Sequence, residues 1–130
     1  MYRSVTNGVQ ITVEPRFVEE ESDPNRAYYF WAYTVEILNL RADRVHLRSR
    51  HWKIISDDGR MQEVRGPGVV GEEPELAPGE SFEYTSGAPL PTPSGVMSGS
   101  YGMEDAAGST FDVAIPAFSL DSPHGERTLN

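Results

Sequence analysis

Apolar and polar residues alternate along much of this chain, which is the period of a strand buried on one face. Val9, Ile11 and Val13 show it near the start, and the segment from Tyr28 to Asn39 shows it best. Alternate residues define two faces of that segment: Trp31, Tyr33, Val35 and Ile37 on one, and Phe30, Ala32, Thr34 and Glu36 on the other. We predict that the first face lies in a core. The second, which includes Tyr28, is either a partner surface or is covered by a loop.

The same period predicts further strands between turn signals. They cover Val45 to Ser56, Met61 to Arg65, Ser81 to Ser86, Val96 to Met103, and Phe111 to Ile115, which Phe118 and Leu120 can extend. The Asp58-Gly59 pair favours a tight hairpin, because both residues tolerate positive φ. Pro89, Pro91 and Pro93 predict an extended crossing loop. No segment has an apolar stripe at helical spacing over three turns.

These elements predict one domain with an all-β fold. About seven strands with turns every 8 to 15 residues are typical of an antiparallel two-sheet sandwich. The 12 glycines and 10 prolines are spread along the 130 residues, as a turn-rich fold requires. We place the domain at residues 1–120 and a polar tail at residues 121–130.

Two long segments resemble the bacterial ApaG family. They are LAPGESFEYTSGAPLPTPSGVMSGSYGM and FDVAIPAFSL, and the similarity extends to VRGPGVVGEEP and YYFWAYTVEILN, so that it covers residues 1 to 120. The resemblance implies an immunoglobulin-like, fibronectin type III-like sandwich. It also implies an association with cobalt resistance and magnesium efflux. Related domains in eukaryotic F-box and polymerase-interacting proteins imply a role in binding other proteins.

Composition limits the function further. A net charge of −9 disfavours nucleic acid, whose binding depends on Lys and Arg. No cysteine is present, so there is no disulfide framework and no thiolate metal site. The first residues lack the apolar core of a signal peptide, and the longest apolar run, Ala27 to Tyr33, is too short to span a bilayer. We expect a cytoplasmic protein that cannot itself be an efflux pore.

The segment from Gly66 to Gly71 has the spacing G-x-G-x-x-G of dinucleotide-binding domains. That motif needs a helix after the glycines, and Pro74 and Pro78 oppose a helix here. Two interpretations stay open: a pyrophosphate site formed by backbone N–H groups, or a loop whose glycines permit unusual backbone angles. The candidate site residues are Arg65, Gly66, Gly68, Val69, Val70 and Gly71.

Metal and catalytic sites have little support in the sequence. His46 and His51 are five apart, so on a regular strand they face opposite sides, and neither they nor His124 has a second ligand at an obvious spacing. Acidic clusters such as Glu72-Glu73 could attract divalent cations weakly. The serines lack an evident acid–base partner. We therefore expect no enzyme, no catalytic residue, no cofactor and no specific metal site.

These observations favour a non-catalytic binding module whose partner is another protein. The predicted partner surface combines the glycine loop, Arg65 to Glu73, with the proline-rich segment, Gly87 to Gly95. The alternative is a sensor that binds a phosphorylated metabolite, pyrophosphate or a divalent cation through Gly66 to Gly71. No nucleic acid or membrane partner is expected. The oligomeric state stays open.

Overall fold

Nine strands and two single-turn 3₁₀ helices form the part of the chain that the computed structural model describes, residues 1–124. The strands are β1 (Tyr2–Thr6), β2 (Val9–Phe17), β3 (Tyr29–Asn39), β4 (Val45–Ser56), β5 (Met61–Pro67), β6 (Glu75–Leu76), β7 (Ser81–Leu90), β8 (Ser94–Asp105) and β9 (Thr110–Asp121). The 3₁₀ helices, η1 (Glu19–Glu21) and η2 (Pro24–Arg26), lie between β2 and β3. None of the described helices is long and apolar enough to cross a membrane.

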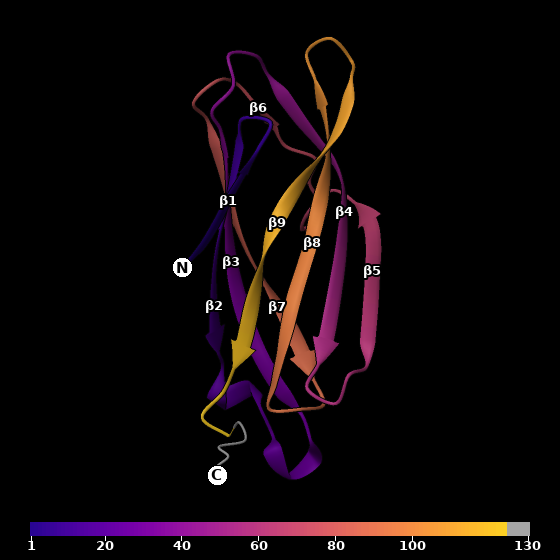
Figure 1. The fold of residues 1–130 in the computed structure, drawn as a ribbon. Coiled ribbons are helices and arrows are strands. Elements are labelled where there is room, and N and C mark those ends of the chain that lie inside the picture. The colour runs from indigo at the N-terminus through magenta and orange to yellow at the C-terminus, as the bar shows by residue number, and fades with distance from the viewer. Residues whose placement is uncertain (125–130) are drawn as a thin grey trace.

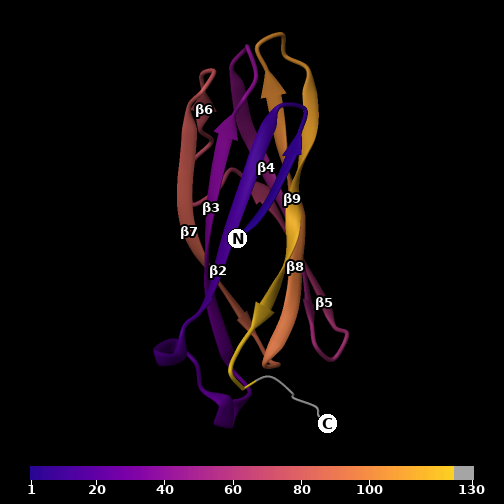
Figure 2. The same ribbon diagram turned by 60° about the vertical axis from the view of Figure 1, so that its left-hand side comes forward.

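Two antiparallel sheets pack face to face (Figures 1 and 2). One sheet has the order β1-β2-β3-β7, and the other has the order β5-β4-β8-β9 with β6 paired to the start of β4. The predicted two-sheet antiparallel sandwich is confirmed. Without β1 and β6, seven strands divide three and four between the sheets, as in immunoglobulin-like sandwiches.

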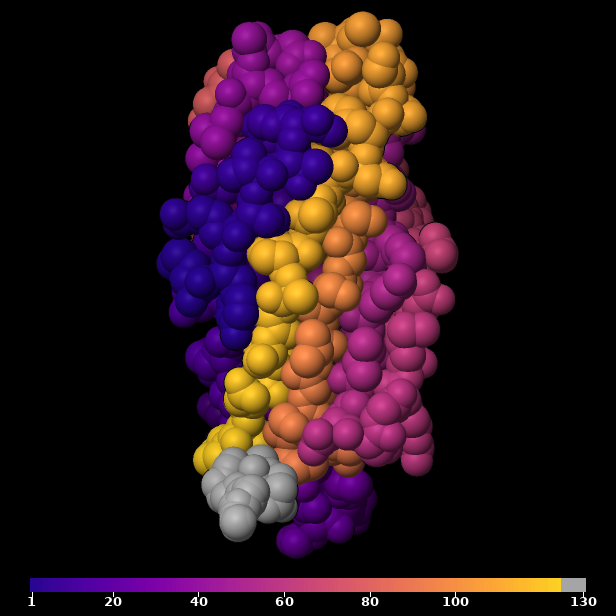
Figure 3. Space-filling model, viewed as in Figure 1, coloured from indigo at the N-terminus to yellow at the C-terminus, as the bar shows by residue number. Residues whose placement is uncertain are grey.

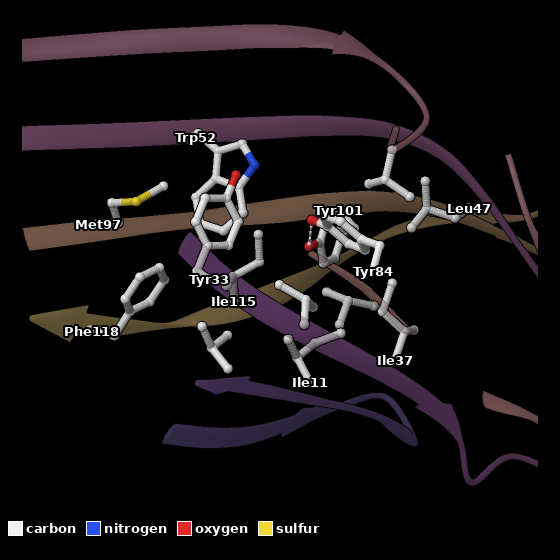
Figure 4. Close-up of a cluster of buried hydrophobic side chains, with 14 of the residues drawn as sticks. Ile11, Tyr33, Ile37, Leu47, Trp52, Tyr84, Met97, Tyr101, Ile115 and Phe118 are labelled. Carbon is white, nitrogen blue, oxygen red and sulfur yellow. Dashed lines mark hydrogen bonds between the residues drawn. The ribbon is translucent and has the colours of Figure 1, made fainter. Parts of the chain in front are cut away.

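The core lies between the two sheets, where one face of every long strand meets the other sheet (Figure 4). The predicted inner face of β3 is confirmed, since Trp31, Tyr33, Val35 and Ile37 are all buried. The opposite face is only partly covered. Tyr28, just before β3, is 42% exposed, while the Phe30 ring lies over Gly87, where an added Cβ would come within 2.3 Å of it.

Two β-bulges change which residues face the core. In β4 the register shifts between Leu47 and Ser49, so Leu47 and Trp52 are both buried although they are five residues apart. The same bulge corrects the expectation for the histidines: His46 and His51 lie on the same, outer side. In β9 a second shift, between the partners of Met97 and Gly99, brings Ile115 and Phe118 onto one face.

Hydrogen bonds join the two sheets along one edge of the sandwich. β1 runs beside β9, with the Ser4 hydroxyl donating to the Ala114 carbonyl at 3.0 Å and the Ala114 N–H donating to the Thr6 hydroxyl at 3.2 Å. The space-filling view shows these segments in contact along that edge (Figure 3). The other two edge strands are β5 and β7, and a cavity lies between the sheets on their side.

The proline-rich segment is shorter as a loop than predicted. Residues Gly87 to Leu90 belong to β7 and pair with β3, and only residues 91–93 form the turn that crosses to β8. Phe30 directs its N–H to Ser22 and its carbonyl to Val18, so it has no ladder bond left for Pro89 opposite. The nitrogen of Pro89, which has no hydrogen, therefore faces the free edge, where proline is tolerated.

Candidate binding cavity between β5 and β7

The glycine loop has a defined local structure. β5 continues through Gly66 and Pro67, and Val69 and Glu72 then form an isolated bridge around a two-residue turn. Val70 and Gly71 occupy that turn with φ values of 43° and 81°. Gly68 also has positive φ, and a Cβ there would lie 2.2 Å from the Glu72 carbonyl oxygen. Glycine at position 68 therefore has a structural reason, and Val70 is a β-branched residue in a strained conformation.

Three backbone donors of this loop are used within the protein. Val69 and Glu72 each donate an N–H to the other's carbonyl at 2.8 Å, and Gly68 donates to the Arg48 carbonyl at 3.0 Å. No helix follows the glycines, as predicted; the chain instead enters the short strand β6. A cradle of free N–H groups backed by a helix dipole, which holds a pyrophosphate in nucleotide sites, is absent from this described loop.

A cavity of about 360 Å³ lies beside the loop. It is lined by residues of both sheets and of the glycine loop: Tyr33, Arg50, Trp52, Ile54, Gln62, Val64, Val69, Val70, Gly71, Tyr84, Ser86, Gly87, Ala88, Pro89 and Met97. Val69 is buried at 1% exposure, whereas Val70 is 53% exposed. The glycine loop and the first part of the proline-rich segment thus border one hollow.

Three of the six candidate site residues line this cavity: Val69, Val70 and Gly71. The other three do not. Arg65 is exposed and pairs with Glu63 at 3.6 Å, and Gly66 and Gly68 contribute backbone beneath and beside the Arg50 guanidinium.

Arg50 is the residue that sequence reasoning did not select for the site. It is half-buried and shares the inner face of β4 with Trp52 and Ile54, as their common spacing indicates. Its Nη1 donates to the carbonyl oxygens of Pro67, at 2.8 Å, and Gly68, at 3.0 Å. Among residues 1–124 no carboxylate lies within ion-pair distance of it.

Tyrosine hydroxyls lie deeper between the sheets. Tyr84 and Tyr101 share a hydrogen bond between their hydroxyls, and the Tyr33 ring packs edge-on against Trp52 with centroids 5.3 Å apart (Figure 4). Burial raises the pKa of all three phenols above its usual value. They are therefore neutral at physiological pH and unsuited to acting as bases, and of the three only Tyr33 and Tyr84 line the cavity, where a phenol can donate a hydrogen bond to a ligand.

The histidines and acidic clusters are engaged elsewhere. His51 Nε2 lies 2.7 Å from Glu63, and this hydrogen bond lowers the pKa of the Glu63 carboxyl. Arg48, at the bulge, pairs with Glu73 at 2.9 Å and with Glu104 at 3.0 Å. Within the described residues no group of three His, Asp or Glu side chains is arranged to hold a metal ion.

Comparison with known proteins gives consistent matches. The model of the ApaG domain family matches residues 19–105. Proteins named ApaG from Bradyrhizobium sp. (strain ORS 278) and Methylobacterium sp. (strain 4-46) are 62% and 60% identical over 130 residues, the whole of both chains. These matches confirm the resemblance described above.

Solved protein structures are also similar to this chain. A crystal structure described as an ApaA protein from Bordetella pertussis is 48% identical, has a TM-score of 0.86, and covers 95% of this chain and 97% of its own. The C-terminal domain of Wzt is 13% identical with a TM-score of 0.55, covering 98% of this chain and 79% of its own, which is a likeness of fold alone.

Proposed function

Because the chain belongs to the ApaG domain family, we propose that it is a non-catalytic module that binds another protein at the side of the sandwich between β5 and β7. One observation carries the proposal: the glycine loop and the end of β7, far apart in sequence, border the same cavity. Both are held by strand pairing, so little conformational entropy is lost when a partner docks.

Val70 is the residue of this surface best placed to touch a partner. It is a large apolar side chain, more than half exposed, in a turn whose positive φ a β-branched residue rarely adopts. Backbone strain of this kind persists where the surrounding structure over-determines it, and it clusters at functional sites. A valine in such a turn is consistent with a binding role.

In this proposal any effect on cobalt resistance or magnesium efflux is indirect. A cytoplasmic module of this kind would act through the protein it binds, which in turn would change metal handling. The proposal therefore requires no metal site on this chain and no cofactor.

Affinity capture from a native cytoplasmic extract, with and without Mg²⁺, tests the proposal. The immobilised wild-type chain should retain one protein in a fixed ratio, and Val70→Ser should lose it while remaining folded. Val96→Ser is the matched control, because Val96 is an exposed valine of β8 that does not line the cavity. Equal capture by all three chains, or none by the wild type, contradicts the proposal.

A sensor of pyrophosphate or a phosphorylated metabolite is the second candidate. Arg50, a cation without a carboxylate partner in the described chain, lies against Gly66 and favours an anion near the loop. In a titration with pyrophosphate, amide signals of Arg65 and Gly66 to Gly71 should shift if this candidate is right. The internal hydrogen bonds of the loop argue for no shift.

A further inference from the structure

The cavity between β5 and β7 combines an apolar interior with a single charged group. Trp52, Ile54 and Met97 form its floor from the second sheet, and Ala88 borders it from the first. Arg50 is the only Lys, Arg, Asp or Glu among its lining residues. Its volume of about 360 Å³ lies at the lower end of the range of small-molecule sites, about 300–1,000 Å³.

The guanidinium of Arg50 is held in place but its charge is not neutralised. Two backbone carbonyls accept from Nη1 alone, and no acceptor for Nε or Nη2 is found in the described residues. The carbonyls orient the group without balancing its charge, and a half-buried cation favours an anion that reaches it. Gly66 leaves room for the guanidinium, since a Cβ at that position would lie only 3.0 Å from Nη2.

The charge of that anion is limited by its surroundings. One arginine matches one negative charge, and the remaining walls are apolar or carry neutral polar groups: the carboxamide of Gln62 and hydroxyls including those of Tyr33 and Ser86. A doubly or triply charged pyrophosphate would lose its hydration without further cations to replace it. The net charge of −9 also opposes a highly charged anion.

We propose that this cavity binds an organic monocarboxylate with an apolar body, the carboxylate on Arg50 and the body against Trp52 and Met97. A free small acid and the C-terminal residue of a protein chain both present this chemistry. This inference rests on the proposed function, and it names the chemical group that binds to Arg50 in the cavity of that site. Its small-molecule test does not require a captured protein, so the two proposals can fail separately.

The test uses matched pairs that differ only in charge. Phenylpropionate, indoleacetate and octanoate are titrated against their uncharged amides, and an acetylated tripeptide ending in Phe is titrated against its C-terminal amide. Signals are followed by two-dimensional NMR. At least one acid should bind tenfold or more tightly than its amide and shift the indole N–H of Trp52. The indole of Trp31, which donates to the Asp121 carbonyl and does not line the cavity, should stay unchanged.

Variants of Arg50 and of its neighbour Arg48 test which arginine binds the carboxylate. Arg50→Gln should weaken the acid at least tenfold and remove the preference over the amide, and Arg50→Lys should retain part of it. Arg48→Gln, on the outer side, should bind as the wild type does. If Arg50→Gln fails to fold, the comparison of acid with amide on the unaltered protein decides.

Binding of the small acids supports a metabolite as the source, and binding of the peptide alone supports a chain terminus. The proposal is overturned if no acid binds, if acid and amide bind equally, if inorganic phosphate competes as well as the acids, or if Arg50→Gln binds unchanged.

Discussion

Val69 and Val70 are adjacent in sequence and differ in what they do for the protein. Val69 is buried against the core in the loop that follows β5, and Val70 is exposed at the tip of a strained turn. Alternation along the chain predicts that neighbouring residues face opposite ways, but it could not indicate which valine faces inward. The bridge between Val69 and Glu72 fixes that choice.

Serine substitutions should separate the two valines. Val69→Ser creates a cavity and buries a hydroxyl, so we expect the free energy of unfolding to fall by about 2 kcal/mol or more. Val70→Ser should change it by less than about 0.5 kcal/mol, as for other surface residues. Urea denaturation measures both, and equal losses would show that Val70 also packs on the core.

Three buried tyrosines give stability an upper pH limit. Burial raises the pKa of Tyr33, Tyr84 and Tyr101 in the folded state above the unfolded value of about 10. Their contribution is therefore fully present below about pH 10 and is lost as pH rises through the folded pKa values, because the unfolded chain gives up these protons first. Denaturation at a series of alkaline pH values should show this fall together with phenolate absorbance. Normal titration of these phenols in the still-folded protein would contradict it.

At the scale of the element, the long strands were largely predictable and the bulges were not. Val45 to Ser56 was predicted with its observed bounds, and the inner face of β3 was read correctly from its alternation. A bulge adds one residue without any composition signal, so the faces of β4 and β9 change where periodicity cannot show it. β1 was missed because it is short and only half-buried.

Arg50 was missed as a site residue because a lone arginine becomes informative only when its neighbours are known.

Pro89 protects the free edge of β7. Its missing N–H removes one donor from an edge that could pair with another chain. Pro89→Val restores that donor and adds a residue that favours strands. We expect unchanged folding but concentration-dependent self-association, measured by sedimentation velocity. Replacing Pro91, which lies in the turn after β7, is the control and should leave the protein's association state as it was. Association by both variants, or by neither, would count against the edge as the cause.

At the scale of the molecule, acidic residues are numerous but dispersed. The clusters pair with arginines or lie in separate turns, and in residues 1–124 they do not converge on one point. We expect Co²⁺ and Mg²⁺ to bind only at about millimolar concentration, as weak oxygen-ligand sites do. Calorimetric titration and metal analysis after dialysis measure this. One metal ion retained per chain after treatment with chelator would refute it.

The edge joined by β1 and β9 differs from the edge formed by β5 and β7, and this asymmetry has a kinetic consequence. Because hydrogen bonds join the sheets at the β1–β9 edge, we expect the smallest local openings to separate the sheets at the opposite edge and to expose β5 and β7. Amide hydrogen exchange should then be faster in these two strands than in β3 and β8, which have neighbours on both sides. A ligand bound between the sheets should slow amide exchange first in β5 and β7, and it should hardly change exchange in β1 and β9.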